Sequence, residues 1–329
     1  MSEQNSGEGR NQSEPSHWER DLLNRMVMAT VAENRRSRRW GIFFKLLTFG
    51  YLFLILGLFL WSDKLQVAQS SAKEHTALVE VKGLISSESK ASADKIVTGL
   101  RSAFEDKKTK GVILRMNTPG GSPVQSRYIN REIMRLKEKY PKIPVYAVVA
   151  DICASGGYYI AAAADKIYAD EGSIVGSIGV LINGFGFVDG MEELGIERRL
   201  LTAGENKGIL DPFSPLDDSD MTHIQRMLDQ LHGQFIETVK EGRGDRLKVE
   251  QYPELFSGLF WSGEEARKMG LIDEFGSSSF VAREVIGVEE IVDFTQKEEV
   301  WDRLARNLGA GAAEVLATIS GLGNGLSIR

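Results

Sequence analysis

Ser155 is the residue of this sequence whose type and setting best fit a catalytic nucleophile. It belongs to the run Ala154-Ser-Gly-Gly157 and lies between an apolar, β-rich stretch at 143–150 and a short apolar stretch at 158–164 that is typical of a helix. The two glycines let other backbone approach closely and leave the first N–H groups of the helix free to bind an anion. The run therefore predicts a nucleophile beside an anion-binding site, although these four residues alone also fit a tight strand-to-helix turn.

A second glycine-rich loop precedes Ser155 and could stabilise negative charge. The run Asn117-Thr-Pro-Gly-Gly-Ser-Pro123 separates a predicted strand at 111–116 from a predicted helix at 124–140. Its free N–H groups would lie at the carboxyl edge of a sheet, where open α/β sheets place their sites. An oxyanion hole or a phosphate cradle is the functional interpretation, and an ordinary β-turn is the structural alternative.

A serine hydroxyl needs a base to remove its proton, and histidine usually has this role. The four histidines fall in less suitable places, namely the N-terminal tail, the linker before the soluble part and the long helix at 217–242 (His17, His75, His223 and His232). A lysine can replace histidine if burial makes its amine neutral near pH 7. Lys207 is the candidate, because Gly204 and Gly208 flank it and an apolar run follows. The alternative for Lys207 is a solvated surface lysine.

The elements that must position these residues follow an alternating pattern. From residue 76 strand and helix patterns alternate, which predicts an α/β fold with a mainly parallel sheet. The remaining predicted strands cover 77–83, 166–169 and 196–201, the helices cover 91–106, 188–194 and 217–242, and a capped short helix that leads into a strand covers 262–273. The helix at 217–242 has an apolar stripe that is predicted to face the core: Met221, Ile224, Met227, Leu228, Leu231 and Phe235.

The N-terminal part has the pattern of a membrane anchor. A polar tail at 1–39 ends in an arginine cluster, and the apolar run at 40–61 is long enough for a helix that spans a bilayer. The arginines predict a cytoplasmic tail and a transmembrane helix that carries the rest of the chain to the other side. A cleavable signal peptide and a buried core helix fit less well, because a long tail precedes the apolar run and the run lacks an amphipathic stripe. A linker at 62–75 follows.

The composition excludes several classes of function. The 329 residues are 42% hydrophobic and carry a net charge of −6, so a large core is possible and a nucleic acid partner is not expected. Cys153 is the single cysteine, which excludes an intramolecular disulfide and a zinc site of clustered cysteines. Its apolar surroundings predict a small side chain that packs in the core rather than a catalytic thiol. The end of the chain, 296–329, is predicted to be a loosely held tail or an intersubunit segment.

Several motifs occur together in a specific order and spacing. They are Asn117-Thr-Pro-Gly-Gly121, Ala154-Ser-Gly-Gly-Tyr-Tyr159, Ala164-Asp-Lys-Ile167, Gly176-Ser-Ile-Gly-Val180, and Lys207 within Ala-Gly-Glu-Asn-Lys-Gly. Taken jointly, this combination resembles the signal peptide peptidase A (SppA) family of serine peptidases, in its short, membrane-anchored bacterial form. The resemblance covers roughly 76–288.

The resemblance implies a ClpP/crotonase-like fold for a peptidase domain at 76–295. It implies a Ser-Lys dyad in which Ser155 is the nucleophile and Lys207 the general base, and it implies neither a metal nor another cofactor. The implied substrates are cleaved signal peptides and other unfolded apolar peptides. The implied location is the bacterial inner membrane, with a single span, a cytoplasmic N-terminus and a periplasmic catalytic domain.

The resemblance also implies roles for the residues around the dyad. The N–H of Gly121 would be the main oxyanion donor, with Gly120 in the same loop and the N–H of Gly156 as a second donor. Ser177 matches a family serine whose hydroxyl orients the lysine. Thr118 stands where the family more often has serine, and this departure bears on the shape of the substrate pocket.

In short family members the active site is shared between protomers, so the resemblance implies a homo-oligomer with a serine from one copy and a lysine from its neighbour. Two other functions stay open at this point. A crotonase-like acyl-CoA hydratase or isomerase would need a glutamate or a similar acid/base pair near the oxyanion hole. A catalytically inactive membrane scaffold is the non-enzymatic alternative, and the presence of both Ser155 and Lys207 speaks against it.

Overall fold

The computed structural model of this chain describes residues 18, 25–28, 38–55, 57 and 73–296. The chain divides into two units, Met1–Gln69 and Ser70–Arg329. In the first unit residues 38–55 are helical. No helix among the described residues combines the length and the apolar character that crossing a membrane requires. The predicted span at 40–61 and linker at 62–75 lie partly outside the described residues, as do most of the tail at 1–39 and of the tail at 296–329.

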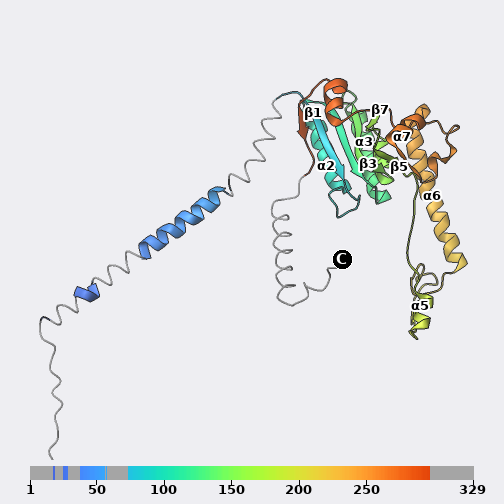
Figure 1. The fold of residues 1–329 in the computed structure, drawn as a ribbon, viewed down its shortest axis with the longest axis horizontal. Coiled ribbons are helices and arrows are strands. Elements are labelled where there is room, and N and C mark those ends of the chain that lie inside the picture. The colour runs from blue at the N-terminus through green and yellow to red at the C-terminus, as the bar shows by residue number, and fades with distance from the viewer. Residues whose placement is uncertain (1–17, 19–24, 29–37, 56, 58–72, 297–329) are drawn as a thin grey trace, which may run out of the picture. The chain divides into compact units, whose positions relative to one another are not determined.

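The second unit is built on an eight-stranded sheet with the order β6-β5-β3-β2-β1-β8, in which β4 also pairs with β3 and with β7 (Figure 1). All pairs are parallel except β5 with β6. This confirms the prediction of a mixed α/β domain with a mainly parallel sheet. The strands are β1 His75–Lys82, β2 Thr109–Thr118, β3 Val145–Ala154, β4 Lys166–Ala169, β5 Ile174–Gly176, β6 Phe260–Ser262, β7 Glu274–Phe275 and β8 Ile291–Asp293.

Helices follow the strands as the sequence pattern predicts. They are α2 Ala93–Glu105, α3 Pro123–Lys139, α4 Gly156–Ala161, α5 Val188–Glu193, α6 Asp218–Arg243, α7 Gly263–Met269 and α8 Ser278–Phe280, together with the π-helix η3 Val281–Ile286 and the 3₁₀ helices η1 Gly244–Arg246 and η2 Pro253–Phe256. Local signals set where they begin. The Ser122 hydroxyl accepts from the Gln125 N–H at the start of α3, where Pro123 occupies the first turn, and Ser262 and Glu265 form a capping box on α7.

Side chains of the central strands alternate between two apolar clusters. In β2, Val112 and Leu114 join the larger cluster, which is shared with α2 and α3, whereas Ile113 joins a smaller cluster with Val281 and Ala282 of η3. A strand points successive side chains to opposite faces of its sheet. The sheet is therefore covered on both faces, which is why the middle of β2, residues 112–114, is continuously apolar.

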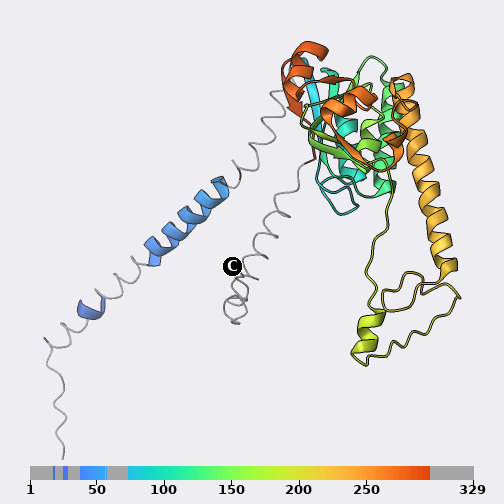
Figure 2. The same cartoon turned by 45° about the vertical axis from the view of Figure 1, so that its right-hand side comes forward.

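An arm, defined as residues 182–216, extends away from the sheet and carries α5 (Figures 1 and 2). Every residue of the arm is exposed or half-buried. It has only small contacts of its own, such as the stack of Phe187 on Phe213 with ring centroids 5.5 Å apart. The predicted strand at 196–201 is wrong, because the arm brings this stretch to no neighbouring strand with which it could pair.

The long helix α6 confirms its predicted position but only part of its predicted burial. Its second half packs on the domain, with Phe235 and Val239 buried. Its first half projects beside the arm (Figure 2). There Met221 is 45% exposed and Met227 is 37% exposed. The prediction that the whole stripe faces the core is therefore wrong for the first half, which shows an apolar face to solvent within this chain.

Two further sequence predictions concern single residues near the sheet. His75 was predicted in the linker, but it begins β1 and is fully buried, with Nδ1 3.0 Å from the Lys73 carbonyl oxygen and Nε2 3.2 Å from Thr109 Oγ1. Cys153 is buried as predicted, and burial raises the pKa of its thiol. Neither side chain is placed to act as a nucleophile or base at the protein surface.

Candidate active site

Ser155 occupies the sharp turn between β3 and α4, as the sequence predicts. Its backbone has φ 52° and ψ −124°, a conformation that residues other than glycine rarely adopt. Two hydrogen bonds hold this turn: the Ser155 N–H donates to the Gly176 carbonyl at 2.9 Å, and the Ser155 carbonyl accepts from the Tyr159 N–H at 3.0 Å. Strained conformations of this kind occur where a surrounding structure fixes a functional side chain.

The glycine loop before α3 lies directly against this turn. The Ile85 N–H donates to the Gly120 carbonyl at 2.8 Å, and the Ser122 N–H donates to the Ile85 carbonyl at 2.8 Å. Both glycines have positive φ, 101° at Gly120 and 144° at Gly121. A methyl group on Gly120 would lie 2.7 Å from Ser155 Cβ, and one on Gly121 would overlap the Ile85 carbonyl. This close approach explains why the loop needs two glycines.

The loop and the turn bring two N–H groups to the same place. The two hydrogen bonds to Ile85 use the Gly120 carbonyl and the Ser122 N–H. The N–H of Gly121, which lies between them in the chain, takes part in neither bond. Gly156 is the first residue of α4, where an N–H has no partner within its own helix. A methyl group on Gly156 would lie 3.3 Å from the Gly121 nitrogen. The two donors are therefore neighbours beside Ser155, as an oxyanion hole requires.

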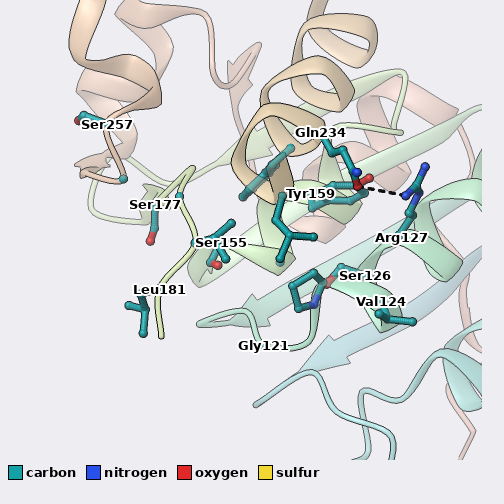
Figure 3. Close-up of a pocket in the computed structure, with 17 residues that line it drawn as sticks. Gly121, Val124, Ser126, Arg127, Ser155, Tyr159, Ser177, Leu181, Gln234 and Ser257 are labelled. Atoms are coloured by element: carbon teal, nitrogen blue, oxygen red, sulfur yellow. Dashed lines mark hydrogen bonds between the residues drawn. The ribbon is translucent and has the colours of Figure 1, made fainter. Parts of the chain in front are cut away.

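A cavity of about 470 Å³ opens over Ser155, and Figure 3 shows its lining. Gly121, Gly156 and Ser155 form one part of its wall. The rest is mostly apolar and comes from α3, Tyr159 of α4, the stretch after β5, the second half of α6, and residues 257–258. Its apolar members are Pro123, Val124, Val180, Leu181, Leu231 and Phe235. This cavity, which we call the catalytic cavity, suits an extended chain with apolar side chains.

Ser177 lies on the same wall of the catalytic cavity. It directly follows β5, whose Gly176 pairs with Ala154 of β3, so the sheet itself places Ser177 beside Ser155. Its φ is 53°, and its N–H donates to the Leu259 carbonyl at 2.7 Å. The hydroxyl groups of Ser155 and Ser177 have no hydrogen-bond partner among the described residues. Both hydroxyls are therefore free to bond a group that enters the cavity.

Lys207 is not part of the catalytic cavity formed by this chain. It belongs to the arm and is exposed, and its N–H donates to the Gly204 carbonyl at 3.1 Å. Among the described residues that line the cavity there is no histidine, lysine, aspartate or glutamate. His232 on α6 lies outside the lining, and its Nε2 is 3.0 Å from the Ile178 carbonyl. Within the described part of one chain, Ser155 and the N–H groups of Gly121 and Gly156 lie together, and no histidine, lysine or carboxylate lines the cavity with them.

Two lining residues were missed by the sequence reasoning. Arg127 and Gln234 line the catalytic cavity, and Arg127 Nη1 donates to Gln234 Oε1 at 3.2 Å. Arg127 lies on α3, where the sequence offers several other arginines and lysines with the same surface pattern. The contact between α3 and α6 that brings the pair together spans 107 positions. No local signal could have singled them out.

Comparisons with known proteins show which family this chain resembles. Residues 137–290 match the family described as peptidase family S49. The chain is 41% identical to a Brucella abortus protein named Na(+)/H(+) antiporter NhaA over 230 residues, which cover 69% of this chain and 31% of that protein. It is 34% identical to a Synechocystis protein named "Putative protease" over 209 residues, which cover 64% of this chain and 72% of that one.

A third relative carries a more specific name. The chain is 32% identical to an Enterococcus faecium protein named "Putative signal peptide peptidase SppA" over 203 residues, which cover 62% of this chain and 55% of that protein. The share covered thus differs widely between relatives, and the match to the Brucella protein spans less than a third of its length.

Proposed function

The chain belongs to peptidase family S49, and we propose that it is a serine endopeptidase that uses a Ser-Lys dyad, with Ser155 as nucleophile and Lys207 as general base. The observation that carries this proposal is the strained turn at Ser155, which faces an apolar cavity beside the N–H groups of Gly121 and Gly156. We also infer that the domain has the ClpP/crotonase-like fold, which the largely parallel sheet with its βα crossovers supports.

The proposed reaction begins when a peptide lies along the catalytic cavity. Lys207, in its neutral form, takes the Ser155 proton while the serine oxygen attacks the scissile carbonyl carbon. The N–H groups of Gly121 and Gly156 bind the oxyanion of the tetrahedral intermediate, and such a donor is worth roughly 10²–10³ in rate. The proton then passes to the leaving amine. Water, activated by the same lysine, hydrolyses the resulting acyl-enzyme and regenerates Ser155.

The lysine in this proposal comes from a neighbouring copy of the chain. Lys207 is exposed and belongs to the arm, which extends away from the sheet (Figure 2). The described residues that line the catalytic cavity of the same chain include no lysine, histidine or carboxylate. The exposed apolar face on the first half of α6, which includes Met221 and Met227, supports an interface at this place. We propose a homo-oligomer in which the arm of one protomer delivers Lys207 to Ser155 and Ser177 of the next.

The proposed substrates are cleaved signal peptides and other unfolded apolar peptides, in keeping with the apolar lining of the cavity. We further propose that the apolar run at 40–61 anchors the chain in the bacterial inner membrane as a single span, with the N-terminus in the cytoplasm and the catalytic domain in the periplasm. An anchor of this kind would hold the cavity near the place where such peptides are released.

The other two functions have less support. An acyl-CoA hydratase or isomerase needs an acid or base close to its oxyanion hole, and the described residues that line this cavity include no carboxylate. An inactive scaffold has no need of the strained serine turn or of two glycines packed against it. These features have a direct purpose in acyl transfer.

The proposal is tested with the detergent-solubilised full chain and a fluorogenic apolar peptide. Ser155→Ala and Lys207→Ala should each lose activity, and Lys142→Ala, at an exposed lysine outside the arm, should retain it. Dissociating and reassembling the two inactive variants together should restore part of the activity. No turnover by the wild type and no labelling of Ser155 by a serine-directed phosphonate would refute the peptidase. Well-assembled mixtures without activity would refute the shared site.

A further inference from the structure

Arg127 carries the only charge on the wall of the catalytic cavity, within the part of the chain that the structure describes. The other lining residues are glycines, apolar side chains and neutral polar groups. Arg127 is half-buried on α3, and Figure 3 shows its side chain beside Gln234, to which the dashed hydrogen bond runs. The proposed hydrolysis uses Ser155, Lys207 and backbone donors and has no step for a guanidinium. The positive charge of Arg127 therefore has a role other than in the chemical step.

The guanidinium of Arg127 is only partly satisfied by its own chain. Nη1 donates to the neutral Oε1 of Gln234 at 3.2 Å, and no carboxylate among the described residues forms an ion pair with it. Arg243 differs, since it is paired with Asp273 at 2.7 Å. A guanidinium has five N–H donors in a planar fork that matches a carboxylate. Arg127 thus offers unused donors in a partly desolvated place.

A second cavity, of about 360 Å³, shares Arg127, Gln234 and Tyr159 with the catalytic cavity. Its wall contains a second arginine, Arg131, and two glutamates of α6, Glu237 and Glu241. The glutamates would repel an anion that entered this second cavity. An anion that binds Arg127 is therefore favoured on the catalytic side, where no acidic side chain lines the wall among the described residues.

We propose that Arg127 binds a carboxylate of the peptide substrate inside the catalytic cavity. The carboxylate is either the free C-terminus of the peptide or an acidic side chain, and both would form the same charge-assisted hydrogen bonds. Because Ser155 and Arg127 line one cavity, the bound carboxylate fixes which peptide bond lies over the nucleophile. Arg127 is thus a specificity-determining residue. This inference rests on the proposed peptidase function.

The test uses three apolar peptides of one sequence with the detergent-solubilised full chain. The first ends in an amide, the second in a free carboxylate, and the third ends in an amide but has glutamate in place of one glutamine near that end. Cleavage sites are read by mass spectrometry, and kcat/KM is measured for the wild type, Arg127→Gln and Arg127→Lys. Arg131→Gln, one helical turn away and absent from the catalytic cavity, is the matched control.

The wild type should cleave at least one carboxylate peptide roughly tenfold faster in kcat/KM than its neutral counterpart, a ratio that corresponds to about 1.4 kcal/mol. A preference for the free acid identifies the C-terminus as ligand, and a preference for glutamate identifies the side chain. Arg127→Gln should remove the preference and spread the cleavage sites, so that kcat/KM for the carboxylate peptides falls to the value for the neutral peptide. Arg127→Lys should retain part of the preference, and Arg131→Gln should retain all of it.

Equal kcat/KM of the wild type on all three peptides would overturn the role of Arg127, and so would a preference that survives in Arg127→Gln. A uniform loss on all peptides in folded Arg127→Gln, together with retained preference, would assign Arg127 to the α3–α6 contact only. Different results would refute the proposed peptidase function itself. In that case the wild type cleaves none of the peptides, or Ser155→Ala cleaves them equally well.

Discussion

Gly120 packs directly against Ser155: a methyl group at its α-carbon would lie 2.7 Å from Ser155 Cβ and 2.8 Å from the Gly156 nitrogen. Because Gly120 has no side chain, the loop that carries Gly121 can pack directly against the turn that carries Ser155. Any widening of this contact moves an oxyanion donor relative to the serine.

A Gly120→Ala variant should lose most of its activity while remaining folded. The backbone φ of 101° and the contact with Ser155 both oppose a side chain at this position, and displacing one oxyanion donor typically lowers kcat by roughly 10²–10³. Peptide hydrolysis and thermal unfolding should be measured together. Gly172→Ala is the control, since its nearest neighbour would be Asp170 Oδ1 at an ordinary 3.4 Å. Turnover of Gly120→Ala near the wild-type rate would contradict this geometry.

Glu132 should make the domain acid-sensitive. Hydrogen bonds from Arg135 lower the pKa of Glu132, and a hydrogen bond from Arg101 lowers it further. Burial of the carboxyl acts in the opposite direction, and the net pKa falls from 4.5 to about 2. A carboxyl whose folded pKa lies below its unfolded pKa contributes stability above the unfolded value and loses it as pH falls through the folded value. We expect roughly 1–3 kcal/mol of this stability to be lost between about pH 4.5 and 2, because both arginines are half-exposed and solvent screens the pairs.

Urea unfolding at a series of pH values checks this expectation. Glu132→Gln should be less stable than the wild type at pH 7 and should show a flatter decline toward pH 2. Glu138→Gln, at an exposed position on the same helix, should follow the wild-type curve. If Glu132→Gln keeps the full acid dependence, the link from α2 to α3 through Glu132 does not contribute as described.

Met227→Glu should weaken the proposed oligomer without unfolding the protomer. Met227 is 37% exposed on the apolar face of the first half of α6, so a charge there meets solvent in a free protomer and apolar surface in an assembled one. We expect a smaller particle by light scattering and a loss of peptidase activity, with an unchanged circular dichroism spectrum. Thr222→Glu puts the same charge on the opposite side of α6 and should leave the particle intact. Equal sizes for both variants would argue against an interface here.

Much of the catalytic cavity could be predicted because its parts have strong local signals. The apolar run of β3, the small residues after it and the paired glycines before α3 each determine their own backbone, and the parallel sheet then brings their ends together. Ser155, Gly121, Gly156 and Ser177 meet for this reason. The apolar periodicity at 217–242 likewise predicts the position of α6.

What could not be predicted depends on the partner of each segment. The stretch at 196–201 has strand-forming residues, but a strand needs a neighbour, and the arm provides none. The apolar stripe of α6 indicates that something covers it, and periodicity cannot say whether the cover is the same chain. Arg127 is positioned by a contact with Gln234 that no short-range pattern encodes.

The backbone at Ser155 sets a limit on how stable this fold can be. A residue with a side chain in that conformation costs about 1–3 kcal/mol relative to a relaxed backbone, and glycine would avoid most of this strain. The chain nevertheless keeps a serine at φ 52°. Ser155→Gly should therefore give a more heat-resistant protein without a nucleophile. Thermal resilience and reactivity are in direct opposition at this single residue.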